Sequence, residues 1–188
     1  MKDENIISTT EMVDVTLTVN GKKSTHTVWK HEKLVDFLHE QLDLPGTRFC
    51  CGIGVCRACT VLSRNVQSAP KVPLLSCSTA VVSLNNHYID TIEGLAQSAN
   101  QITPLQEEFL KHFSFQCGYC TPGFLMAATA LIEQLKQSPI AKNEINQAIE
   151  QACGEHICRC TGYVRYYQAI RKVIENTPGT LIKESTHV

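Results

Sequence analysis

One segment decides the organisation of this chain: Thr47-Arg-Phe-Cys-Cys-Gly-Ile-Gly-Val-Cys-Arg-Ala-Cys-Thr-Val61. It carries the thiols of Cys51, Cys56 and Cys59, and two glycines lie between the first two of these cysteines. Glycine has no Cβ and adopts backbone conformations that other residues avoid, so its backbone can approach a bound group closely. We therefore predict a loop that wraps around a group held by thiolates.

The spacing of these cysteines is typical of a plant-type [2Fe–2S] site. Cys51-x4-Cys56-x2-Cys59 is followed, after seventeen residues, by Cys77, which matches the C-x4-C-x2-C…C pattern. A zinc knuckle built on the C-x2-C pair is the alternative, but it does not account for the x4 arm and its glycines. The pattern therefore favours an iron–sulfur cluster in the first half of the chain.

A second group of cysteines lies in the other half, in Cys117-Gly-Tyr-Cys120-Thr-Pro-Gly and Cys158-Arg-Cys160-Thr-Gly-Tyr. A thioredoxin-like dithiol would leave the later pair unused and would need a βαβ pattern, which this half lacks. Each pair stands just before a predicted helix, and helix N-termini favour an anionic group held by four thiolates. Spacing alone leaves an iron–sulfur cluster and a zinc ion both open here.

Composition narrows the class of protein. The chain has 188 residues, a net charge of −1, 43% hydrophobic residues and ten cysteines, which suits a globular protein with its own core better than a small disulfide-stabilised one. The near-neutral charge argues against a nucleic-acid partner. The absence of an apolar run of about 20 residues predicts no transmembrane segment. Met1 to Asn5 lack the features of an export signal, so we expect a cytoplasmic location, with periplasmic export beside a signal-bearing partner as the alternative.

The fold is predicted to be α+β, with a β-grasp, plant-type ferredoxin-like domain over residues 11–92. Alternation of apolar and polar residues predicts strands, and Asn20-Gly21 predicts a hairpin turn. The expected elements are strands over 13–19, 24–29, 58–62 and 80–84, a helix over about 31–41, and a polar loop over 65–73. Residues 1–10 and 179–188 are expected to be flexible tails.

The second half, residues 93–178, is predicted to be a helical [2Fe–2S]-binding domain arranged as a four-helix bundle. Thr103-Pro-Leu-Gln106 predicts a capped helix start, because threonine, proline and glutamine occupy the N-cap, first and capping-box positions. Leu105, Phe109 and Phe113 are expected to share the buried face of that helix. The four helices are expected to begin near Pro104, Thr121, Asn143 and Tyr163.

Three motifs occur together in the order that one family carries them. The cysteine loop around Cys51, the segment Gln116-Cys-Gly-Tyr-Cys-Thr-Pro-Gly123 and the segment Cys158-Arg-Cys-Thr-Gly-Tyr163 closely resemble the small iron–sulfur subunit of the molybdenum hydroxylases. This superfamily includes xanthine dehydrogenase, aldehyde oxidoreductase and carbon monoxide dehydrogenase. The resemblance covers residues 12–176, nearly the whole chain.

The resemblance implies an electron-transfer subunit with two [2Fe–2S] clusters. The implied ligands are Cys51, Cys56, Cys59 and Cys77 for the first cluster, and Cys117, Cys120, Cys158 and Cys160 for the second. It also implies that Gln116 and Cys160 contact a molybdopterin-type molybdenum cofactor held by a large partner subunit. An FAD subunit or cytochrome c is then the expected electron acceptor.

No catalytic residues are predicted on this chain, because it has no P-loop, no dinucleotide fingerprint and no HExxH site. It would therefore be an oxidoreductase subunit whose substrate chemistry lies on another chain. A stand-alone ferredoxin-like carrier is the alternative function, but such a carrier needs only the first half. A zinc-binding interaction module is a further alternative, and it would be colourless.

A few residues lie outside these assignments or depart from the family pattern. Cys50 and Cys153 are expected to be buried packing residues, and His156 is expected to be exposed to solvent. Arg57 stands where glycine is usual in the family, and Glu155 with His156 replaces a frequent Gly-Asn. We expect these departures to affect the cluster potentials and the partner surface rather than the ligands.

Overall fold

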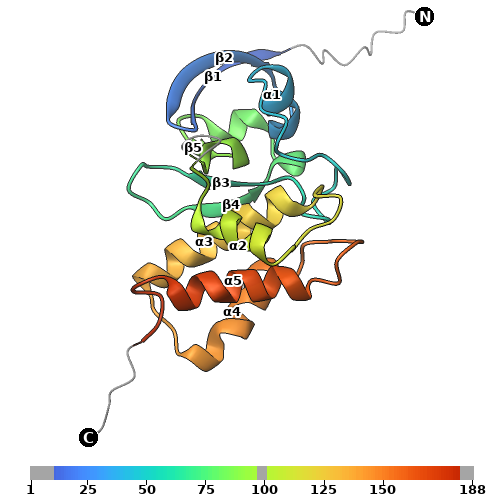
Figure 1. Ribbon diagram of the computed structural model, residues 1–188. Coiled ribbons are helices and arrows are strands. Elements are labelled where there is room, and N and C mark those ends of the chain that lie inside the picture. Colours follow the sequence, from blue (N-terminus) through green and yellow to red (C-terminus); the bar gives the residue numbers. More distant parts are fainter. Residues whose placement is uncertain (1–10, 97–100, 183–188) are drawn as a thin grey trace, which may run out of the picture.

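The computed structural model describes residues 11–96 and 101–182. The sheet and the first α-helix lie in the upper part of Figure 1, and the later α-helices lie in the lower part. The sheet has five strands in the order β2-β1-β5-β3-β4. The α+β class is confirmed, while the arrangement of the four helices as a bundle stays a prediction.

The first hairpin is built as the sequence indicates. β1 (Met12–Val19) pairs antiparallel with β2 (Lys22–Trp29). Asn20 and Gly21 both have a positive φ, of 49° and 80°, which is the conformation of a two-residue hairpin turn that matches the twist of the strands. Alternate residues of β1 are buried, and the burial of Val15 and Leu17 places one face of the hairpin in the core. The predicted strand–turn–strand unit is confirmed.

The remaining strands differ from the prediction. β3 (Thr60–Arg64) begins two residues later than expected and pairs antiparallel with β4 (Val72–Leu75) and β5 (Tyr88–Asp90), and β5 also pairs parallel with β1. Two of these strands are very short, which weakened their signal. The strand expected over 80–84 is wrong, because these residues form the 3₁₀ helix η2 (Val81–Leu84).

The error at η2 has a simple physical cause. Val81 and Leu84 are both buried, and residues three apart lie on the same side of a 3₁₀ helix. A short apolar run therefore looks the same as a buried strand in sequence. The helix α1 (Leu34–Glu40) is shorter than the predicted range of 31–41, and it packs Phe37 and Leu38 against the sheet.

The helical half contains α2 (Pro104–Lys111), α3 (Thr121–Gln137), α4 (Ile145–Cys153) and α5 (Val164–Asn176). Short 3₁₀ turns occur at η1 (Ser76–Ser78), η3 (Ile92–Gly94) and η4 (Lys142–Glu144). The predicted capping box is confirmed, because the Thr103 hydroxyl accepts from the Gln106 backbone N–H and the Gln106 side chain accepts from the Thr103 backbone N–H. Phe124 stacks on Tyr166 with ring centroids 4.3 Å apart, at the centre of this half.

Two expectations for this half are wrong. Phe113 does not share the buried face of α2, because the helix ends at Lys111 and Phe113 is 74% exposed. The flexible tail was expected from residue 179, but Thr180 is fully buried and the Ile182 N–H donates to the Ile140 carbonyl at 3.0 Å. The chain therefore packs against the helices through residue 182, and residues 1–10 and 183–188 lie outside the described part.

The two halves share a packed seam. α3 lies against β3 and β4 (Figure 1). Leu62 of β3 and Met126 and Ala130 of α3 form one apolar cluster. Gly123 allows the closest approach, since a Cβ at this position would lie 2.4 Å from the carbonyl oxygen of Arg57. No helix among the described residues is long and apolar enough to cross a membrane.

Candidate metal centres

The first thiol site is formed by the loop before β3 and by η1. Cys51, Cys56 and Cys59 come from the loop, and Cys77 comes from η1. The thiols of Cys51 and Cys56 lie close enough to shift each other's pKa, and the Cys59 thiol contributes in the same way to the pKa shift of Cys77, so the four thiols form two pairs. Only Cys51 is appreciably accessible to solvent.

Backbone amides of the loop surround these thiols. The Cys56 N–H lies 3.4 Å from Cys51 Sγ, and the backbone N–H groups of Ile53 and Val55 also bond this sulfur. Led by the bond from Cys56, these donors lower the pKa of Cys51 to about 6. Burial instead raises the pKa of Cys77 to about 11. The loop therefore stabilises sulfur in its anionic form most strongly at its accessible edge.

The glycines of this loop have the conformation that the sequence predicts. Gly52 and Gly54 have φ values of 71° and 78°, in the left-handed region where a Cβ causes strain. A Cβ at Gly54 would also crowd the Ser78 hydroxyl at 3.3 Å. These conformations turn successive N–H groups inward, which is how short loops provide concave sites for anions.

The second thiol site lies between α2 and α3 on one side and before α5 on the other. Cys117 and Cys160 are exposed, and their sulfurs are 3.6 Å apart. Cys120 and Cys158 are buried, and their thiols lie close enough to shift each other's pKa. This site therefore also consists of two thiol pairs, one at the surface and one inside.

Hydroxyl groups contact the buried pair. Burial raises the pKa of Cys120 to about 12, while the Tyr166 hydroxyl lies 3.5 Å from its sulfur. Burial also acts against the thiolate of Cys158, but hydrogen bonds led by the Thr161 hydroxyl, 3.1 Å away, lower its pKa. Thr161 and Tyr166 were not predicted as site residues, although the position of Thr161 directly after Cys160 was an available signal.

The arrangement of the thiols distinguishes between the two metals left open by the sequence. A structural zinc ion needs its four ligands around one point, whereas a [2Fe–2S] cluster spreads four thiolates over two irons. Two thiol pairs per site, bordered by backbone N–H groups at the first site and by hydroxyl groups at the second, fit the two-iron cluster.

The thiol-bearing loops gather on one side of the molecule, at the right in Figure 1, and contact each other there. The Ile157 N–H donates to the Cys56 carbonyl oxygen at 3.1 Å. The Tyr119 hydroxyl donates to the Phe49 carbonyl, and the guanidinium of Arg48 lies 5.7 Å from the centre of the Tyr119 ring. The two sites are therefore neighbours held by direct contacts.

Other predicted residues have mixed outcomes. Gln116 lies at the exposed edge of the second site, where its amide Nε2 donates to the Cys160 carbonyl at 2.9 Å. Cys153 is fully buried as expected, and burial raises its pKa to about 12. The expectation for Cys50 is wrong, since it is exposed. It lies on the loop beside Cys51 but points away from the packed interior.

The prediction for His156 is wrong. It is only 3% exposed, although we expected it at the surface. Its ring packs on Phe124 with centroids 4.9 Å apart, and Nε2 lies 3.3 Å from the Thr60 hydroxyl. Burial, followed by the positive charge of Arg57, lowers the pKa of His156 to about 4, so the imidazole is neutral at physiological pH. No periodic pattern in the sequence indicates that His156 is buried between the two halves of the chain.

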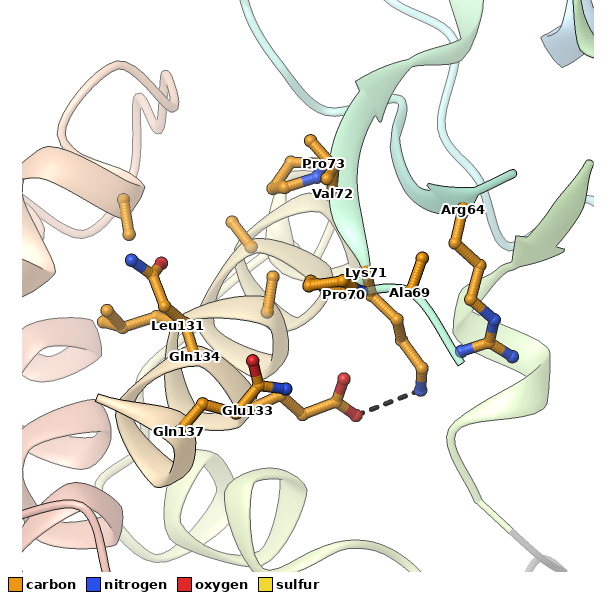
Figure 2. A pocket seen from close by; sticks show the side chains of 13 residues that line it. Arg64, Ala69, Pro70, Lys71, Val72, Pro73, Leu131, Glu133, Gln134 and Gln137 are labelled. Atoms are coloured by element: carbon orange, nitrogen blue, oxygen red, sulfur yellow. Dashed lines mark hydrogen bonds and ion pairs between the residues drawn. The ribbon is translucent and has the colours of Figure 1, made fainter. Parts of the chain in front are cut away.

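One cavity lies apart from both thiol sites. It measures about 480 Å³ and lies between the segment before β4 and α3 (Figure 2). Lys71 donates to Glu133 at 3.0 Å at its edge and also contacts Asp90 at 3.2 Å. No cysteine lines this cavity, so it is not part of either thiol site.

Known families match both halves. A model described as "2Fe-2S iron-sulfur cluster binding domain" matches residues 17–82, and one described as "[2Fe-2S] binding domain" matches residues 91–171. The nicotine 6-hydroxylase small subunit of Paenarthrobacter nicotinovorans is 36% identical over 93% of this chain and 94% of its own length. The 6-hydroxypseudooxynicotine dehydrogenase complex subunit beta of the same organism is 38% identical over 82% of this chain and 89% of its own length.

Some larger proteins contain a segment that is similar to this chain. Xanthine dehydrogenase of Calliphora vicina is 35% identical over 77% of this chain, which corresponds to 11% of that protein. Among solved structures, quinoline 2-oxidoreductase from Pseudomonas putida 86 is similar with a TM-score of 0.73 and 32% identity, over 86% of this chain and 92% of the matched chain. Aldehyde oxidoreductase from Desulfovibrio gigas has a TM-score of 0.74 at 29% identity, over 92% of this chain and 18% of that chain.

Proposed function

This chain belongs to the iron–sulfur subunits of the molybdenum hydroxylase family, and we propose that it connects a molybdopterin site on a partner subunit with a flavin or cytochrome acceptor. Its membership makes it an electron-transfer subunit of an oxidoreductase that binds [2Fe–2S] groups. When bound, such a group accepts and releases one electron at a time. The identity of the two neighbours in the electron path is the part that we propose.

Eight cysteines are the proposed ligands of the two clusters. They are Cys51, Cys56, Cys59 and Cys77 in the first site, and Cys117, Cys120, Cys158 and Cys160 in the second. The support is their division into two thiol pairs at each site, with backbone N–H groups at the first and hydroxyl groups at the second. Cys50 and Cys153 are left out because neither forms a thiol pair.

The second site is proposed to face the large molybdenum-cofactor subunit. Its outer thiols, Cys117 and Cys160, are exposed, as is Gln116, whose amide bonds the backbone of Cys160. A partner docked at this edge would cover these three residues and could place a pterin against Gln116 and Cys160. The role of this chain is then to hold and orient the edge, and to keep water from the inner thiols Cys120 and Cys158.

The first site is proposed to serve the acceptor side, which is an FAD subunit or cytochrome c. Its accessible thiol, Cys51, lies at the outer edge of the glycine loop. The hydrogen bond between Ile157 and Cys56 supports an internal route from one site to the other.

We also propose that the chain divides into two domains, residues 11–92 and residues 93–178, and that the second domain is a four-helix bundle. A cytoplasmic location is a further part of the proposal.

The observation that carries this proposal is the pair of neighbouring four-thiol sites, one with an exposed edge. The test is to purify the full chain from its native source through a tag and to analyse the co-purifying chains for molybdenum, flavin and haem. We expect a large molybdenum-containing chain in fixed ratio. A chain that purifies alone, with its clusters intact and no affinity for such a partner, would indicate a stand-alone carrier instead.

A further inference from the structure

Where the two thiol sites meet, a hydrogen bond and an ion pair join the loop that carries Cys56 to the loop that carries Cys158. The electron-transfer role does not explain these contacts. Among the described residues, the bond from Ile157 N–H to the Cys56 carbonyl is the only backbone–backbone hydrogen bond that joins segments of the two halves distant in sequence. It joins a residue of the first site to the residue preceding Cys158. A single hydrogen bond at a surface loop opens easily unless neighbouring groups hold it closed.

Arg57 is placed to hold this bond. It follows Cys56 directly and has a φ of +60°, a left-handed conformation that is costly for a residue with a Cβ. Its guanidinium forms an ion pair with the carboxylate of Glu155, two residues before Ile157. The charged pair therefore spans the seam one residue away from Cys56 on one side and two residues away from Ile157 on the other.

The backbone of Arg57 is fixed from two directions, which aims its side chain across the seam. The Thr60 hydroxyl donates to the Arg57 carbonyl oxygen at 2.7 Å. Gly123 of α3 packs against the same carbonyl so closely that a Cβ there would lie 2.4 Å away. The side chain of Arg57 is 32% exposed, so part of the pair is shielded from water, while Glu155 is 72% exposed and can be substituted without disturbing the core.

We propose that Arg57 and Glu155 are positioning residues whose ion pair clamps the first-site loop to the second-site loop and keeps the Cys56–Ile157 hydrogen bond closed. The pair is the only ion pair between these two loops in the described ranges, since Arg48 and Arg159 have no carboxylate partner there. The clamp fixes the separation of the sites, and electron transfer between sites depends steeply on that separation.

Amide hydrogen exchange of the full chain tests the clamp without any assumption about the clusters. Arg57→Gln and Glu155→Gln should each accelerate exchange of the Ile157 N–H by about two- to fivefold, as expected for loss of a partly exposed ion pair. The exchanged pair R57E/E155R should restore slow exchange. Lys30→Gln is the matched control, because it breaks an ion pair with Glu11 on the sheet, far in sequence from the seam.

Unchanged Ile157 exchange in both single variants would overturn the clamp, as would failure of the exchanged pair to restore it. Salt is a second check: the difference between Arg57→Gln and the original chain should shrink in 1 M salt, where the Debye length falls to about 3 Å. A difference that persists in full would show that the arginine acts through packing alone.

The effect on the clusters rests on the proposed function and is measured separately. In the cluster-loaded chain, Arg57→Gln removes a positive charge and should lower the midpoint potentials, while Glu155→Gln removes a negative charge and should raise them. Shifts of the same sign in both variants would contradict the charge effect. A chain that binds no clusters would count against the proposed function, whereas the exchange experiment would still decide the clamp.

Discussion

The backbone N–H of Ile157 donates to the carbonyl oxygen of Cys56 across 3.1 Å, although these residues belong to different halves of the chain. Cys56 is a thiol residue of the first site, and Ile157 is bonded directly to Cys158 of the second. One hydrogen bond and a short covalent path therefore connect the two sites.

The second site should be separable from the first by mutation. Cys158→Ser removes one inner thiol of the pair that it forms with Cys120. We expect one of two [2Fe–2S] signals to disappear from the electron paramagnetic resonance (EPR) spectrum of the reduced chain, while the other remains. Cys50→Ser is the control, because Cys50 is exposed and forms no thiol pair, and both signals should persist there. Loss of the first-site signal in Cys50→Ser would show that Cys50, not Cys51, is the ligand.

Gly123→Ala should destabilise the seam. Within α3, replacing glycine by alanine normally stabilises a helix by about 1 kcal/mol. Here the new Cβ would lie 2.4 Å from the Arg57 carbonyl oxygen and close to the Ala58 backbone, so either α3 or the loop must move. We expect a net loss of about 1–3 kcal/mol, seen as a lower melting temperature. An unchanged or higher melting temperature would contradict the close approach.

The Thr161 hydroxyl should tune the second cluster. Its Oγ1 donates to Cys158 Sγ at 3.1 Å, and such bonds favour the reduced, more negative state of a cluster. Thr161→Val keeps the shape of the side chain and removes the donor. If this hydrogen bond is stronger in the reduced cluster than in the oxidised one by about 1 kcal/mol, the difference corresponds to roughly 40 mV for one electron. The midpoint potential of one cluster should therefore fall by about this amount in Thr161→Val. Thr129→Val, whose hydroxyl bonds only the Leu125 carbonyl, should leave both potentials unchanged.

Gln116 should matter for the complete complex but not for the isolated chain. Its amide donates to the Cys160 carbonyl at the exposed edge of the second site. Gln116→Ala should leave both EPR signals and the melting temperature of the chain nearly unchanged, and it should lower turnover of the assembled enzyme by about tenfold or more. Gln134→Ala, at the cavity beside α3, is the control and should not affect turnover. Normal turnover of the Gln116 variant would remove this residue from the partner interface.

Much of the fold was readable from local patterns. The turn at Asn20-Gly21 and the capping box at Thr103 are short-range signals, because both depend on residues a few positions apart. β5 was missed because it is only three residues long and owes its place to neighbours on both sides rather than to its own sequence. The apolar spacing at Val81 and Leu84 fits a strand and a 3₁₀ helix equally well.

The site shows the same division between local and long-range information. The cysteine spacing indicated which thiols would meet, and the structure brings them together in pairs. The burial of His156 could not be predicted, because it results from contacts with Thr60 and Phe124, which are distant in sequence. The pair of Arg57 and Glu155 was visible only as two departures from a family pattern, and its meaning depends on the seam.

The most direct test of the central claim is quantitative EPR of the fully reduced chain, combined with iron, sulfide and zinc analysis of the same sample. Two four-thiol sites that each hold a [2Fe–2S] cluster predict about four irons and four sulfides per chain, no zinc, and two distinct spin signals of equal intensity. One spin signal, or zinc in place of half of the iron, would contradict the assignment of two iron–sulfur clusters to this chain.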